Sequence, residues 1–354
     1  MNIILKLTTA PKTKPADESK LGFGKLFTDH MFMMDFTRDK GWHDARIVPY
    51  GPLSLDPSAT VLHYSQSIFE GMKAYREDSG KIRLFRPRDN FIRLNTSARR
   101  LSIPEIDVDN ALAALHKLIN IEQDWVPSTV GASLYIRPTI IADDPFLGVH
   151  AADKYIFFII LSPSGAYYPQ GLAPIDILVE KEYVRSVRGG LGYTKAGANY
   201  AASILAGDIA SKNGFQQVLW LDGSERKYIE EVGSMNIFFK VNGEIWTPEL
   251  SGSILPGITR DSVIKIARDM GITIIEKRID VNELFKLGED GLIEEVFGSG
   301  TAAVISPVGS LTYNGKRLTI NNGEIGALSQ TLYDRLIGIQ YGKINDPYGW
   351  TSAL

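Results

Sequence analysis

The stretch KYIFFIILSPSGAYYPQGLAPIDILVE, residues 154–180, contains two apolar runs that are separated by a segment rich in Pro, Gly and Ser. An almost wholly apolar run is typical of a buried strand, whereas clustered Pro and Gly interrupt regular structure. We therefore predict that a first domain, residues 1–163, ends with a strand at 154–163. Residues 164–174 are the predicted interdomain linker, and a second domain spans 175–354.

Signals for helices and for strands occur on each side of this linker. Alternating or continuous apolar runs predict strands, and apolar residues at helical spacing predict helices. The predicted strands are 29–36, 80–87, 132–142, 154–163, 175–184, 216–221, 235–241 and 273–279, with a strand, glycine turn and strand over 294–308. The predicted helices are 90–101, 110–125, 198–212, 259–270, 281–287 and 324–340. This mixture predicts an α/β (α+β) fold of two domains, with the cleft at their junction as the expected ligand site.

The composition excludes several classes of protein. The formal net charge is −3 at pH 7, which gives no indication of a nucleic-acid partner or of an anionic membrane surface. No stretch approaches the roughly 18 apolar residues that a membrane helix needs. The sequence has no cysteine, so disulfides, thiol nucleophiles and zinc–thiolate sites are excluded, and no histidine cluster indicates another metal site. We expect a cytoplasmic protein without a metal.

The segment GYTKAGANY, residues 192–200, places Lys195 among small residues. A lysine amine can form a Schiff base with an aldehyde, and small neighbours leave room for a flat ring to approach. Desolvation would favour the uncharged, nucleophilic amine. An ordinary solvated loop lysine is the alternative. A phosphate-binding P-loop is excluded, because Thr194 stands where that motif requires glycine.

Pyridoxal phosphate would need an acid for its pyridine nitrogen, a donor for its ring oxygen and a cradle for its phosphate. Glu231 lies at the start of the apolar segment EEVGSMNIFF, and Tyr200 lies at the start of a helix of small residues. Ile258 and Thr259 follow a turn and begin a helix, where backbone N–H groups bind anions. The segment FGSGTAA, residues 297–303, offers further backbone donors and one hydroxyl. An exposed strand-end glutamate and a simple helix cap are the alternatives.

Together these segments resemble the branched-chain amino-acid aminotransferases, which are pyridoxal-phosphate enzymes of fold type IV. The resemblance covers roughly residues 25–350. It rests on the stretches LHYSQSIFEGMKAYR, IRLFRP, ASLYIRP, YVRSVRGGLGYTKAGANY, QVLWLDG, EEVGSMNIFF, LPGITR and EEVFGSGTAAVISPV. It implies a small N-terminal α/β domain, a larger C-terminal α/β domain, and transamination of L-leucine, L-isoleucine or L-valine with 2-oxoglutarate.

The resemblance also implies a role for each matched residue of the cofactor site. Lys195 would be the Schiff-base lysine and the proton shuttle. Tyr200 would hydrogen-bond the ring oxygen, and Glu231 would pair with the protonated pyridine nitrogen. The other implied cofactor ligands are Arg93, Ile258, Thr259 and Thr301 at the phosphate, with Arg185 and Ser234 close by.

For the substrate, the resemblance implies an aromatic wall of Phe69, Tyr135 and Tyr167 that accepts the branched side chain. Arg137 would meet the distal carboxylate of glutamate, and Tyr64 would help to hold the α-carboxylate. The backbone N–H groups implied at the same α-carboxylate are those of Thr301 and Ala302.

Leu147 and Val149 resemble the loop that reaches into the partner subunit's site in this family, which implies a homodimer. The chain departs from the family at two places. Ser234 stands where threonine is common, so the hydroxyl is retained. Ala303 and Ser306 stand where animal members have a C-x-x-C pair, so a thiol switch at this position is excluded.

Two other interpretations stay open. A D-amino-acid aminotransferase or an aminodeoxychorismate lyase would share the fold type, but the stretches HYSQSIFEG and SLYIRP are not expected in those shorter relatives. A non-catalytic binding protein could use the same scaffold. The complete set of Lys195, Tyr200, Glu231 and Arg93 argues against lost chemistry.

Overall fold

The computed structural model describes residues 1–165 and 172–354. Residue contacts divide the chain into two compact units. The first unit comprises Met1–Pro169, Thr194–Ala198 and Ile339–Leu354, and the second comprises Gln170–Tyr193 and Asn199–Gly338. The sequence division places the segment around Lys195 and the C-terminal segment in the second domain, whereas the contacts assign both to the first unit. The linker prediction falls largely outside the described residues.

The first unit contains a sheet whose strands run in the order β1-β3-β2-β8-β7-β5-β6-β18, with β4 paired to β7. All its pairs are antiparallel except β1 with β3 among the described residues. Its strands are β1 (Ile4–Leu5), β2 (His30–Thr37), β3 (Gly41–Pro49), β4 (Ser67–Phe69), β5 (Met72–Arg76), β6 (Ile82–Phe85), β7 (Ser133–Ala142), β8 (Lys154–Ser164) and β18 (Thr351–Ala353). The apolar strands β7 and β8 pair along their whole length at the centre of this sheet.

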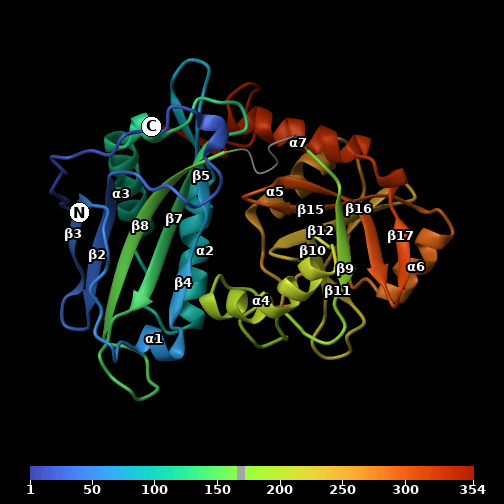
Figure 1. Cartoon of the computed structure of the whole chain (residues 1–354), viewed down its shortest axis with the longest axis horizontal. Coiled ribbons are helices and arrows are strands. Elements are labelled where there is room, and N and C mark those ends of the chain that lie inside the picture. The colour runs from blue at the N-terminus through green and yellow to red at the C-terminus, as the bar shows by residue number, and fades with distance from the viewer. Residues whose placement is uncertain (166–171) are drawn as a thin grey trace. The chain divides into compact units, whose positions relative to one another are not determined.

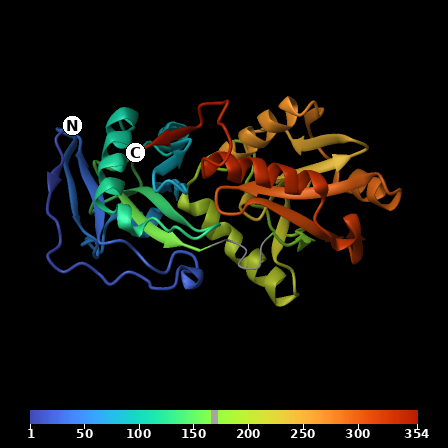
Figure 2. The same cartoon turned by 90° about the horizontal axis from the view of Figure 1, so that it is seen from above.

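Alternation along β7 gives the sheet two different faces, because successive side chains of a strand point to opposite sides. Leu134, Ile136 and Ile140 belong to the main hydrophobic core. Helices α2 (Pro87–Arg100) and α3 (Val108–Ile121) lie beside this sheet in the ribbon views (Figures 1 and 2). They contribute Leu94, Leu115 and other residues to that core. Burial of each such leucine or isoleucine contributes about 1.5–3 kcal/mol. Tyr135 and Arg137 therefore lie on the face that α2 and α3 leave uncovered.

The second unit contains a sheet in the order β11-β10-β9-β16-β15-β12-β13-β14, with β17 paired to β16. An additional pairing of β11 with β12 closes strands β11, β10, β9, β16, β15 and β12 into a ring. Its strands are β9 (Ile175–Val179), β10 (Gln217–Leu221), β11 (Ile229–Val232), β12 (Met235–Val241), β13 (Glu244–Pro248), β14 (Ile274–Lys277), β15 (Ile293–Gly300), β16 (Val304–Tyr313) and β17 (Lys316–Thr319). Glu231 lies in the closing pair, in register with Asn236.

The remaining helices are α1 (Thr60–Tyr64), α4 (Gly197–Lys212), α5 (Ile258–Asp269), α6 (Val281–Glu289) and α7 (Ala327–Gln340). In the second unit α5 packs on β15, as the ribbon shows (Figure 1). Each predicted helix and strand is present, with its ends moved by a few residues, so the predicted α/β fold class is confirmed. Among the described residues, no helix combines the length and the apolar character that crossing a bilayer requires.

Candidate active site

The backbone around Lys195 is held by elements of the first unit. The Lys195 N–H donates to the Ser97 hydroxyl of α2 at 3.0 Å, and its carbonyl accepts from the Phe69 N–H at 3.0 Å. Ala196 forms a β-bridge with Ile68 of β4. The Lys195 ammonium lies 5.1 Å from the centre of the Phe69 ring. The predicted Schiff-base lysine is therefore fixed at its backbone, while its side chain lies against an aromatic ring.

The small neighbours of Lys195 have a structural cause that the sequence interpretation did not identify. A Cβ added at Gly197 would come within 2.7 Å of the Ser67 hydroxyl oxygen. A Cβ added at Gly192 would come within 1.9 Å of the Ser253 carbonyl oxygen. At these two glycines other protein atoms exclude a side chain, so packing within the protein is itself a reason for glycine.

Three of the predicted substrate residues lie together on the face of the first sheet that is opposite α2 and α3. The Arg137 guanidinium carbon lies 4.6 Å from the Phe69 ring centre and 5.3 Å from the Tyr135 ring centre. Arg137 also donates to the Tyr135 hydroxyl at 3.1 Å. A Cβ on Gly71 would meet that hydroxyl at 2.1 Å, which explains glycine at this position. Tyr167 lies outside the described residues.

Lys73 belongs to the same face and was missed by the sequence analysis. It is paired in register with Tyr135, so the two side chains project from the same side of the sheet. Lys73 is 9 % exposed, and burial lowers its pKa to about 8. The signal that could have found it is a lysine inside the otherwise apolar strand segment MKAY.

This burial predicts a pH-dependent stability. A lysine whose pKa is lower in the folded state costs stability below that pKa, and the cost disappears as the pH rises toward the ordinary value near 10.4. We expect the stabilising effect of Lys73→Met to be about 2 kcal/mol larger at pH 7 than at pH 9.5. Urea unfolding at both pH values measures it. Lys181→Met, at an exposed position, is the control, and it should change the free energy of unfolding equally at pH 7 and at pH 9.5. A change for Lys73→Met that is also equal at the two pH values would contradict the lowered pKa.

The predicted phosphate ligand Arg93 makes a buried, bidentate ion pair with Glu70. Its Nε and Nη2 donate to the two carboxylate oxygens of Glu70 at 2.7 and 2.9 Å. Glu70 is fully buried, and Arg93 is 8 % exposed. The same helix, α2, supplies Ser97 to the Lys195 backbone, so one element positions both the lysine and this arginine. Glu70 was not identified from the sequence, because its partner lies 23 positions away.

Tyr64, implied at the α-carboxylate, also lies in the first unit, as do Leu147 and Val149 of the loop implied to reach a partner. The Tyr64 hydroxyl, at the end of α1, donates to the Leu147 carbonyl. Leu147 is 66 % exposed and Val149 is 83 % exposed. Leu147 and Val149 are therefore exposed apolar side chains of one loop, which is hydrogen-bonded to Tyr64.

Glu231 is the centre of the candidate cofactor site in the second unit. It is 2 % exposed, and its carboxylate lies 3.2 Å from Arg185 Nε and accepts from the Leu255 N–H at 2.6 Å. Arg185 is also buried and donates to the carbonyls of Gly192 and Ser253 at 2.8 and 2.6 Å. A buried carboxylate with these donors is stabilised as an anion.

Four predicted cofactor residues line one hollow in this unit. They are Arg185, Tyr200, Glu231 and Ser234, and the other lining residues are Asn199, Ser203, Gly233 and Leu255. The hollow therefore combines an anion, a phenol and a hydroxyl. This is the donor set that a pyridinium ring with a ring oxygen requires, so the residues fit pyridoxal phosphate.

The predicted anion cradle consists of a helix start and a hairpin turn. Helix α5 begins at Ile258 with Gly257 as its N-cap, which supplies no side-chain cap. A Cβ on Gly257 would come within 2.0 Å of the Asn236 side-chain oxygen, so the close approach requires glycine. Thr301 and Ala302 lie in the turn between β15 and β16. Val304, which ends this turn, has a φ of 63°, a strained value for a β-branched residue.

Comparison with known proteins identifies the family of this chain. Residues 67–311, more than half of the sequence, match the family described as "Amino-transferase class IV". The chain belongs to the class IV aminotransferases. This membership confirms the predicted enzyme class, and the relatives below confirm the resemblance to its branched-chain members.

Two relatives cover almost the whole chain. One is "Branched-chain-amino-acid aminotransferase 2" of Bacillus subtilis (strain 168), which is 54% identical over 352 residues, 99% of this chain and 97% of its own length. The other is "Probable branched-chain-amino-acid aminotransferase" of Staphylococcus aureus (strain N315), which is 56% identical over 340 residues, 96% of this chain and 94% of its own length.

Solved structures support the same fold. The branched-chain amino acid aminotransferase of Escherichia coli matches with a TM-score of 0.76 and 29% identity, covering 92% of this chain and 98% of its own. The branched-chain aminotransferase of Thermoproteus uzoniensis, solved with norvaline, matches with a TM-score of 0.74 and 25% identity, covering 91% of this chain and 99% of its own.

Proposed function

We propose that this protein is a pyridoxal-phosphate-dependent branched-chain-amino-acid aminotransferase. It transfers the amino group of L-leucine, L-isoleucine or L-valine to 2-oxoglutarate and releases the branched 2-oxo acid and L-glutamate. The observation that carries the proposal is the hollow lined by Glu231, Tyr200 and Arg185. Relatives of that name, 54% and 56% identical over nearly the whole chain, support the substrate class.

The cofactor supplies an aldehyde carbon for the substrate amine and an electron-withdrawing ring. In our proposal Lys195 holds the cofactor and then moves the proton of the substrate α-carbon. Glu231, as an anion, keeps the proton on the pyridine nitrogen, and Tyr200 donates to the ring oxygen. The proposed phosphate ligands are Arg93, Thr301 and the backbone N–H groups of Ile258 and Thr259, with Ser234 nearby.

The enzyme must accept both an apolar branch and a carboxylate. Phe69 and Tyr135 offer apolar surface for the branched side chain of the substrate. We propose that Tyr167 completes this aromatic wall. The Nε atom of Arg137 is buried and has no hydrogen-bond partner among the described residues. The distal carboxylate of glutamate would supply the missing acceptor. The proposed ligands of the α-carboxylate are Tyr64 and the N–H groups of Thr301 and Ala302.

Removal of this guanidinium should separate the two kinds of substrate. We expect Arg137→Met to lower kcat/KM for glutamate about 10- to 100-fold, the value of one charge-assisted hydrogen bond, and to affect leucine far less. Half-reaction kinetics with each amino acid measure the ratio. Arg38→Met, at an exposed ion pair with Asp153, is the matched control. An equal loss for both substrates would contradict the assignment.

We further propose that the protein is a cytoplasmic homodimer. Leu147 and Val149 of each copy would then reach into the site of the other copy. Their exposure in one loop, next to the exposed Phe146, supports this proposal, because such a patch of large apolar side chains favours a partner.

A substrate screen tests the function directly. The holoenzyme should convert L-leucine with 2-oxoglutarate and should leave D-alanine and aminodeoxychorismate largely unchanged. Preference for D-alanine or for aminodeoxychorismate would instead support one of the shorter relatives of this fold type. A protein that binds no cofactor at all would support the non-catalytic alternative.

A further inference from the structure

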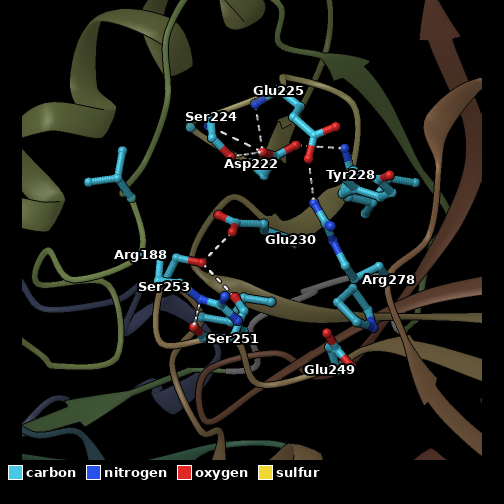
Figure 3. A pocket seen from close by; sticks show the side chains of 15 residues that line it. Arg188, Asp222, Ser224, Glu225, Tyr228, Glu230, Glu249, Ser251, Ser253 and Arg278 are labelled. Atoms are coloured by element: carbon cyan, nitrogen blue, oxygen red, sulfur yellow. Dashed lines mark hydrogen bonds and ion pairs between the residues drawn. The ribbon is translucent and has the colours of Figure 1, made fainter.

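Behind Glu231 lies a second buried carboxylate that the proposed chemistry does not use. Glu230 and Glu231 are successive residues of β11, so their side chains point to opposite sides of the strand. Glu231 lines the hollow described above, whereas Glu230 lines a different cavity of about 470 Å³. Figure 3 shows Glu230 in this cavity with Ser251, Ser253 and Arg188 beside it.

Only one carboxylate oxygen of Glu230 is hydrogen-bonded among the described residues. It is 5 % exposed, and one of its carboxylate oxygens accepts from the Ser253 hydroxyl (Figure 3). The Ser253 hydroxyl also lies 2.8 Å from the Ser251 hydroxyl. The second oxygen, Oε2, is buried and has no hydrogen-bond partner in the part of the chain that the structure describes. Burial raises the pKa of Glu230, and the hydrogen bond from Ser253 and the charge of Arg185 oppose the rise. The negative charges of Glu231 and Asp222 add to it.

Ser253 connects this carboxylate to the cofactor acid. Its hydroxyl donates to Glu230, and its carbonyl accepts from Arg185 Nη2 at 2.6 Å. Arg185 lies 3.2 Å from Glu231. The Ser253 carbonyl also lies so close to Gly192 that no side chain fits there. Ser253 therefore links Glu230 to Arg185 through two hydrogen bonds, one donated by its hydroxyl and one accepted by its carbonyl.

We propose that Glu230 is a positioning residue for the cofactor acid: through Ser253 it holds Arg185 and so sets how strongly Arg185 offsets the charge of Glu231. Arg185 contacts Glu231, and its charge also acts on Glu230. An ionised Glu230 draws more of the guanidinium charge, which leaves Glu231 better able to retain a proton on the pyridine nitrogen. This inference rests on the proposed pairing of Glu231 with that nitrogen.

The test uses the holoenzyme and pyridoxal phosphate itself as the probe. Glu230→Gln keeps an acceptor for Ser253 but removes the charge, whereas Glu230→Met removes both. The control is Glu225→Gln, which changes an acid of the same cavity that is paired with Arg278. The readouts are the dissociation constant of pyridoxal phosphate and the midpoint of the pH titration of the visible cofactor absorbance.

We expect Glu230→Met to weaken cofactor binding about 10-fold, the range of coupling within one hydrogen-bond network. At low pH, where Glu230 is neutral, Glu230→Gln should bind pyridoxal phosphate with the same dissociation constant as the unchanged protein. It should also move the midpoint of the absorbance titration to lower pH. Glu225→Gln should leave both readouts unchanged. A purely structural role would lower stability without moving the midpoint, and that result would overturn the proposal.

Glu231→Gln separates this inference from the proposed function. If Glu231→Gln alters both readouts while the Glu230 variants behave like Glu225→Gln, the connection through Ser253 is wrong and the cofactor assignment stands. If Glu231→Gln also alters neither readout, the proposed pairing with the pyridine nitrogen fails, and the inference fails with it.

Discussion

Lys195→Ala is expected to lower kcat for amino-group transfer at least about 10⁴-fold while the protein stays folded. In the proposed mechanism Lys195 both attaches the cofactor and moves the α-proton, and the substitution removes both roles. Proton transfer by a positioned side chain alone is worth up to about this factor. The backbone of residue 195 is hydrogen-bonded to Ser97 and Phe69, and alanine retains these two bonds.

Rapid-mixing kinetics with L-leucine measure this loss, and circular dichroism checks the fold. Lys212→Ala is the matched control, because Lys212 lies on α4 at an exposed ion pair with Asp208. The control should keep nearly full activity. Transamination by Lys195→Ala at more than about one-hundredth of the normal rate would exclude this lysine as the proton-transfer group.

Glu231→Gln should slow the proton-abstraction step about 10²- to 10³-fold and still permit the cofactor to bind. The amide has nearly the same shape, but it has no negative charge to hold a proton on the pyridine nitrogen, and loss of one such electrostatic partner costs about this much. Single-turnover measurements with L-leucine isolate the step. Glu249→Gln, at an exposed position of the same unit, is the control. A proton-abstraction rate equal to that of the control would remove Glu231 from the mechanism.

Local sequence signals were sufficient for much of the fold. The apolar runs of β7 and β8 and the spacing of α2 are strong patterns that do not depend on distant residues. The same holds for the start of α5, where the turn before Ile258 precedes a regular helix. Strand β3 was missed because its segment GWHDARIVP mixes polar and apolar residues, and β11 because it has only four residues.

The parts of the site that were not predicted depend on tertiary contacts. Glu70 and Lys73 look like ordinary charged residues in the sequence, and only their burial beside Arg93 and Tyr135 distinguishes them. Glycine at positions 192 and 197 has a cause that the sequence does not show, because atoms of distant segments leave no space for a side chain there. The assignment of the Lys195 segment to the first unit has the same origin, because its partners are Phe69, Ile68 and Ser97 rather than neighbours along the chain.

The residues that we propose for the chemistry have clearer signals in the sequence than the residues that support them. Lys195, Tyr200 and Glu231 stand out because each is a polar residue in a small or apolar segment. Their supporting residues, Arg185 with Ser253 above all, are linked by hydrogen bonds to carbonyl groups, and such bonds leave no trace in residue type.

The central claim is that one amine, that of Lys195, carries the cofactor. Reduction of the holoenzyme with borohydride, followed by tryptic digestion and mass spectrometry, locates the attached pyridoxyl group. Lys73 is the main alternative site of attachment, because burial lowers its pKa to about 8. At neutral pH a larger fraction of this amine is uncharged and nucleophilic than in an ordinary lysine. We predict that the group is found on Lys195, within the peptide 189–212. Its recovery on Lys73 or on any other lysine would contradict the account.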